Sequence, residues 1–246
     1  MKAKNWRFIL AIALVALSAI LYTIHFFIFR DAHHIFIYLL GDIAFTPIEV
    51  LIVTLIIHRL LTDREKKAML KKLNMVIGAF FSEVGLKLVY ISAEFDVKSG
   101  FLKQELSNIK NWDDKDFIKA SKRIEEYDHK IESTKGNLKE LKLFLTKRRD
   151  FLLRLLENPN LLEHEKFTEL LWAVFHLTEE LEYREDLENL PESDYEHISG
   201  DISRVYLLLI AGWLDYIKHL KERYPYLFSL AARVNPFDKQ ASPIVT

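Results

Sequence analysis

Two carboxylic acids, Asp42 and Glu49, lie inside an apolar stretch that is long enough to cross a lipid bilayer. The stretch covers residues 35–57 and reads IFIYLLGDIAFTPIEVLIVTLII. Each ionisable group costs roughly 2.5–3.5 kcal/mol when a helix inserts into hydrocarbon. A partner, a bound proton or contact with water can offset that cost. These two acids are therefore the first candidates for function, either in moving an ion or in holding helices together.

The spacing of the polar residues in this stretch places them on one helix face. Asp42, Thr46 and Glu49 follow the i, i+4, i+7 pattern. Pro47 removes a backbone donor and frees the carbonyl of residue 43 to accept a hydrogen bond or bind a cation. Glu49 lies near the middle of the stretch. We expect Glu49 either to carry a proton or to face water in an oligomer.

A second polar stripe lies in an earlier apolar stretch, residues 8–29. His25 and Ser18 share one helix face there, together with Tyr22. In one antiparallel register of two helices, His25 lies opposite Asp42 and Ser18 lies opposite Glu49. This register gives Asp42 a structural partner and leaves Glu49 with a weak one.

Both stretches are predicted to be transmembrane helices. Residues 8–29 contain no Asp, Glu, Lys or Arg, exceed the apolar part of a typical secretory signal and lack a convincing cleavage site. The connector, residues 30–34, allows little besides an antiparallel hairpin. Lys and Arg precede the first stretch and follow the second, which predicts that both termini are cytoplasmic and that the protein lies in the cell (inner) membrane.

Composition predicts an all-α protein. Only 7 Gly and 6 Pro occur among 246 residues, and Leu, Glu and Lys are abundant. A net charge of −1 gives no argument for a nucleic-acid partner, and the absence of Cys excludes disulfides and thiolate chemistry. We predict a transmembrane hairpin in residues 1–58, a cytoplasmic helical bundle in residues 59–234 and an irregular tail in residues 235–246.

The expected bundle contains one unusually long pattern. Apolar residues recur with a seven-residue period from Phe117 to Leu155, which is typical of a coiled-coil-like helix, and Gly136 would mark a bend in it. The partner of that seam could be another helix of the chain or a second subunit.

Other parts of the bundle follow from periodicity and capping signals. We expect an amphipathic helix with its aromatic face in the core, rather than a third membrane span, at residues 75–93. The other predicted features are a capping box at Thr62–Glu65, a loop at 98–112, a buried helix at 163–185, a helix at 194–223 capped by Ser193 and Glu196, and a short helix at 224–234.

Metal and catalytic motifs are weak. Glu126-x-x-His129 falls on the outer face of the heptad pattern, and Asp194-x-x-His197 falls in the first turn of its helix. His176 is expected to be a core histidine bonded to Glu179 or Glu180. We therefore predict no metal, no cofactor and no catalytic residue.

One short residue spacing and one arrangement of segments resemble known families. The spacing of Arg123 and His129 is similar to the arginine–histidine spacing of HEPN ribonucleases. Two spans with a tight outer turn, acids and Pro47 in the second span, and an inner domain with a coiled coil resemble the mitochondrial calcium uniporter pore in outline. The order and spacing of its WDIMEP signature differ here and its Trp is absent, so no residue role is transferred.

A broader resemblance covers most of the chain. The segments LLGDIAFTPIEVLIVTLIIHRLL, KKLNMVIGAFFSEVG and YPYLFSLAARVNPF resemble an uncharacterised family of prokaryotic two-span membrane proteins. This resemblance implies a shared fold and a membrane location, and it supplies no activity.

We expect a non-enzymatic membrane-anchored scaffold whose bundle binds a protein partner or forms a homo-oligomer in contact with the lipid bilayer. The nearest alternative is an oligomeric cation-conducting or proton-linked pore that uses Asp42, Glu49, Thr46, Pro47 and His25. A membrane-tethered HEPN-like ribonuclease is a distant third.

Overall fold

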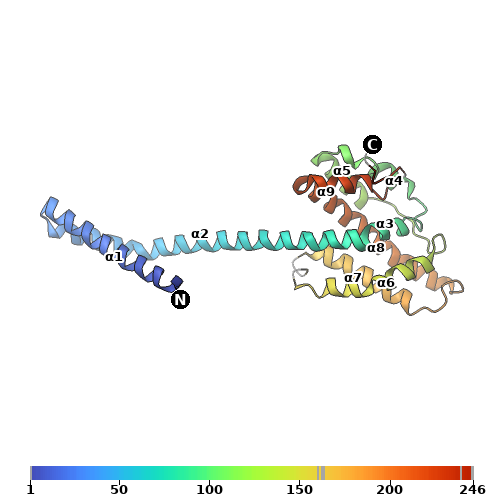
Figure 1. Cartoon of the computed structure of the whole chain (residues 1–246), viewed down its shortest axis with the longest axis horizontal. Coiled ribbons are helices and arrows are strands. Elements are labelled where there is room, and N and C mark those ends of the chain that lie inside the picture. Colours follow the sequence, from blue (N-terminus) through green and yellow to red (C-terminus); the bar gives the residue numbers. More distant parts are fainter. Residues whose placement is uncertain (1, 160, 162–163, 239, 245–246) are drawn as a thin grey trace. The chain divides into compact units, whose positions relative to one another are not determined.

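The fold is all-α, as the composition predicts. The computed structural model describes residues 2–159, 161, 164–238 and 240–244, which are helices and turns without a strand (Figure 1). One isolated bridge pairs Asp96 with Ile131. The chain divides into two compact units, Met1–Lys66 and Lys67–Thr246.

The first unit contains helix α1, Lys2–Phe29, and most of the apolar part of helix α2, Ala32–Phe80. The predicted connector of five residues is wrong, because only Arg30 and Asp31 separate the helices. Arg30 has a φ of 51°, and the Asp31 carboxylate accepts hydrogen bonds from the backbone N–H groups of His33 and His34. Asp31 thus satisfies two of the free backbone donors at the start of α2, which begins at Ala32 and therefore before the predicted start at residue 35.

The apolar residues of this unit face outward. Phe8–Phe29 and a segment of α2 are long and apolar enough to cross a membrane, and within the described part of the chain no residue in their most hydropathic windows is buried. Such an exposed surface needs an apolar environment or a partner.

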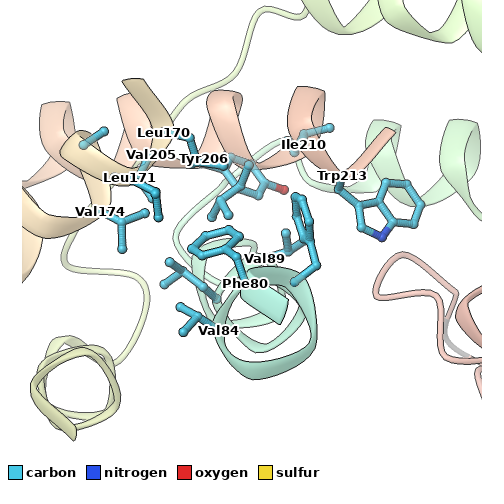
Figure 2. Close-up of a cluster of buried hydrophobic side chains, with 14 of the residues drawn as sticks. Phe80, Val84, Val89, Leu170, Leu171, Val174, Val205, Tyr206, Ile210 and Trp213 are labelled. Carbon is cyan, nitrogen blue, oxygen red and sulfur yellow. The ribbon is translucent and has the colours of Figure 1, made fainter. Parts of the chain in front are cut away.

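The second unit has its own core around one long helix. Helix α8, Glu192–Arg223, packs against helices α7, Glu165–Glu182, and α9, Pro225–Arg233. Helix α2 continues into a π turn, Phe81–Gly85, and helix α3, Leu86–Ser92. Figure 2 shows Phe80 of this segment facing Tyr206 of α8, and Val84 lies in the same buried cluster. The predicted amphipathic helix with its aromatic face in the core is therefore confirmed.

The predicted long coiled-coil-like helix is wrong. Helix α5, Asp114–Glu125, ends before the middle of the pattern, and helix α6, Leu138–Leu156, begins after Asn137. The intervening segment is held by tertiary hydrogen bonds, for example from Ser133 Oγ to the carbonyl of Tyr195. The apolar periodicity still identified buried positions, such as Phe117 in α5 and Leu145 in α6.

Both predicted capping boxes are wrong. Thr62 lies inside α2, where its hydroxyl donates to the carbonyl of His58. Helix α8 follows Pro191 and has no side-chain cap from Ser193.

Two segments are more ordered than the sequence predicts. Residues 98–112 contain helix α4, Gly100–Leu106, and a 3₁₀ turn, Ile109–Asn111. In the tail, Asn235 is buried and its amide donates to the carbonyl of Leu106. The first residue of the predicted tail therefore packs against the C-terminal end of α4, a contact that local periodicity could not predict.

Candidate functional site

Asp42 and Glu49 lie on α2 with exposed side chains. Among the residues that the structure describes, neither carboxylate forms a hydrogen bond or an ion pair. The hydroxyl of Thr46 donates a hydrogen bond to the backbone carbonyl of Asp42, at a distance of 2.7 Å. Pro47 lies inside the continuous helix. The acids therefore have no partner from α1.

The predicted register of the hairpin is wrong at His25. Its ring stacks on His34, with centroids 5.9 Å apart, and also lies 4.7 Å from the ring of Phe29. The shorter connector moves the turn towards the N-terminus, so His25 lies opposite the first turns of α2 instead of Asp42. The Nε2 atom of His25 is buried, and it forms no hydrogen bond with any residue that the structure describes.

A second group of polar side chains lies on α7 and α8 in the other unit. His176 and Glu180 are one turn apart on α7, and His197 and Asp201 are one turn apart on α8. Because residues at i and i+4 share a helix face, each helix presents an imidazole and a carboxylate together. Asp201 Oδ2 lies 3.5 Å from His176 Nε2 and 3.4 Å from His197 Nε2.

Asp201 has an unusual environment. Its side chain is 6% exposed, and Arg204 Nη1 donates to its Oδ1 atom at 3.2 Å. The Oδ2 atom is buried, and no residue in the described part of the chain forms a hydrogen bond with it. A buried carboxylate oxygen without a donor is costly, so this oxygen marks the centre of the group.

Arg184 organises the acids at the edge of the group. It donates two hydrogen bonds to Asp194, at 2.7 and 2.8 Å, and one to Glu180 at 2.6 Å. The guanidinium hydrogen bonds hold the pKa of both carboxyls below their usual range. Glu180 Oε2 also lies 3.5 Å from His197 Nε2.

The sequence did not predict this group. The expectation of a core position for His176 is wrong, because the side chain is 47% exposed. Its nearest acid on α7 is Glu180, whose Oε1 lies 3.9 Å from Nε2. The missed signal was a pair of His-x-x-x-acid spacings, His176–Glu180 and His197–Asp201, on neighbouring helices.

The side chains of the ribonuclease-like spacing contact different residues. Arg123 forms an ion pair with Glu105. His129 Nε2 lies 2.6 Å from the hydroxyl of Ser203 on α8.

These features define an all-helical protein with an apolar N-terminal unit and a separately packed helical domain. Residues 2–61 match the family model described as "MJ1433, N-terminal helical domain", and residues 69–233 match "Uncharacterized protein MJ1433, C-terminal helical domain". The chain belongs to this MJ1433 family.

A relative from Methanocaldococcus jannaschii, named Uncharacterized protein MJ1433, is 51% identical over 241 residues, covering 98% of this chain and 97% of the relative. No solved structure matches the chain. The predicted resemblance is thus confirmed for an uncharacterised family with two helical domains, and its membrane location stays a prediction.

Proposed function

We propose that the chain is a non-enzymatic, membrane-anchored helical module. The two apolar segments of α1 and α2 hold it in the bilayer, and the unit Lys67–Thr246 binds a protein partner or a second copy of the chain. One observation carries the anchor: the most hydropathic windows of both helices have no buried residue. Burial of apolar area is worth roughly 25 cal/mol per Å², so these surfaces favour hydrocarbon strongly over water.

A topology experiment tests the anchor. The chain has no Cys, so His33→Cys in the first turn of α2 and Ala241→Cys near the C-terminus each introduce a single thiol. With a membrane-impermeant maleimide, we expect His33→Cys to be labelled in intact cells and Ala241→Cys only after the membrane is opened.

The membrane fraction should also retain the protein after carbonate extraction. Release of the protein by carbonate, or labelling of both thiols in intact cells, would contradict the anchored arrangement.

The partner-binding part has a separate test. We expect the full chain in mild detergent to have a mass, measured by light scattering, of at least two protomers, or to crosslink to a defined protein in membranes. A strictly monomeric chain that crosslinks to nothing would count against a scaffold and leave the anchor intact.

A cation-conducting or proton-linked pore is the second candidate, and the unpaired acids favour it. Asp42 and Glu49 lie seven residues apart on one helix, which corresponds to about 10 Å along its axis. If several hairpins assemble with this face inward, the acids form two rings of negative charge, and such rings select cations.

Flux measurements in liposomes distinguish the two candidates. A pore predicts cation or proton flux for the wild type and its loss in Asp42→Asn and Glu49→Gln. Lys110→Gln, on the other unit, serves as a control that keeps the flux. Absence of flux in the wild type would exclude the pore and leave the anchored module standing.

A further inference from the structure

We propose that His176, His197 and Asp201 form a binding site for a divalent transition-metal ion, for which Zn²⁺ is the best fit. One ligand atom from each residue lies within 4.8 Å of the other two. The site is in the unit Lys67–Thr246 and does not rest on the proposed function of the hairpin.

The distances fit tetrahedral coordination. Zinc binds imidazole nitrogen and carboxylate oxygen at about 2.0–2.2 Å, which places neighbouring ligand atoms of a tetrahedron about 3.4 Å apart. Asp201 Oδ2 lies 3.4 and 3.5 Å from the two imidazole nitrogens. The imidazoles are about half exposed, so each can rotate to close the remaining gap between them without disturbing the core.

The buried oxygen of Asp201 is an independent reason to place an ion there. Its Oδ2 atom points between the two imidazoles and has no hydrogen bond, whereas Arg204 holds the Oδ1 atom. A metal ion would satisfy the buried oxygen. Arg204 would act as the outer hydrogen-bond donor that fixes the ligand's orientation, as is usual around protein metal sites.

The local charge also favours a cation. Three carboxylates, those of Glu180, Asp194 and Asp201, face two guanidinium groups, those of Arg184 and Arg204. With neutral imidazoles the net charge of the group is −1. Arg184 is engaged by Glu180 and Asp194, so its charge does not oppose an ion at Asp201 Oδ2.

The ligand types select the class of metal. Two imidazoles and one carboxylate suit Zn²⁺ and other first-row transition metals better than Mg²⁺ or Ca²⁺, which prefer oxygen ligands alone. The fourth position would be taken by water or by Glu180, whose Oε2 lies 3.5 Å from His197 Nε2. An all-protein set would make the site structural, and a bound water would leave it open to a ligand.

The test is metal binding by the full chain in detergent. The protein is first treated with a chelator to remove bound metal, and any histidine tag is cleaved off. We expect isothermal titration with ZnCl₂ to show one ion per chain. We expect His176→Gln and His197→Gln each to weaken binding by about tenfold or more, since even outer-shell changes cost that much. Titration with CoCl₂ should give the intense visible bands of tetrahedral cobalt, and these should be lost in both variants.

Glu196→Gln is the matched control, because this exposed acid is the neighbour of His197 on α8. It should bind zinc like the wild type. Circular dichroism checks that each variant is folded, and because His176 and His197 are exposed, we expect both histidine variants to keep the fold. A wild type that binds no zinc, or binding that survives unchanged in both histidine variants, would overturn the proposal.

Discussion

Arg184 links two acids that lie on different helices, Glu180 on α7 and Asp194 on α8. Its guanidinium donates to Asp194 through two nitrogens and to Glu180 through the third. All three side chains are less than one-third exposed. Partial burial strengthens these charge-assisted hydrogen bonds, and the bidentate geometry fixes the loop between α7 and α8.

Replacing Arg184 should destabilise the helical domain in a pH-dependent way. In Arg184→Gln we expect a loss of about 1–3 kcal/mol of unfolding free energy at pH 7. Arg184 lowers the pKa of Glu180 and Asp194, so its stabilisation is present above the unfolded pKa of about 4 and disappears as pH falls through the folded values. Urea denaturation at pH 7 and pH 3 should therefore show a smaller difference between variant and wild type in acid.

The exposed pair of Lys139 and Glu188 provides the control for this measurement. Both side chains are more than 60% exposed. Lys139→Gln should change stability by less than about 0.5 kcal/mol. An equal loss in both variants, or a loss in Arg184→Gln that does not vary with pH, would contradict the assigned role of Arg184.

Residue types alone identified some candidates and missed others. Asp42 and Glu49 stand out because charged residues are rare in apolar stretches. Asp201 does not stand out, because its burial and its unpaired oxygen depend on how α8 packs against α7.

At the scale of elements, the π turn Phe81–Gly85 connects α2 to α3 within the core. A Cβ atom at Gly85 would lie 2.5 Å from Cδ1 of Phe81. Phe81 is buried and stacks on Tyr216, with ring centroids 5.1 Å apart. The ring therefore cannot move aside freely, and only a residue without a side chain fits this position.

We expect Gly85→Ala to destabilise the domain by about 1–3 kcal/mol through overpacking. Gly200→Ala is the matched control, since nothing lies within 4 Å of the added Cβ in α8. That control should gain about 0.5–1 kcal/mol from its higher helix propensity. Thermal unfolding followed by circular dichroism measures both, and a neutral Gly85→Ala would show that the ring has room to move.

Element boundaries show why periodicity has limited power. The seven-residue pattern from Phe117 to Leu155 correctly marks positions that become buried, but the chain distributes them over α5 and α6. Hydrogen bonds of the connecting segment to α8, such as Ser133 Oγ to Tyr195 O, stabilise the interruption. A local sequence pattern cannot indicate hydrogen bonds to residues that are far away in the chain.

At the scale of the whole molecule, the two units have different kinds of surface. Among the residues that the structure describes, the unit Lys67–Thr246 buries many large apolar side chains, such as Trp213 and Tyr206, whereas the most hydropathic windows of α1 and α2 bury none. Each unit thus has its own requirement for stability, which is a core for one and an apolar environment or a partner for the other.

This division predicts that changes at Asp42 and Glu49 leave the helical domain unaffected. In Glu49→Gln we expect the unfolding free energy of the domain, obtained from urea denaturation, to equal that of the wild type within about 0.5 kcal/mol. Fluorescence of Trp112, Trp172 and Trp213 reports on the domain, and Trp6→Phe removes the tryptophan of the first unit. Gly85→Ala, which should shift the midpoint, shows that the signal responds. A comparable shift in Glu49→Gln would mean that the units are energetically coupled.

The sequence by itself determined the all-α class, the two long apolar helices and many of the buried positions in α5 and α6. These depend on local propensity, on stretch length and on the period of apolar residues, which are all properties of neighbouring residues. Only the tertiary structure decided that His25 meets His34, that the heptad pattern breaks into α5 and α6, and that two histidines converge on Asp201. Those outcomes depend on which helices pack together, because hydrogen bonding, burial and charge act between residues that are far apart in the chain.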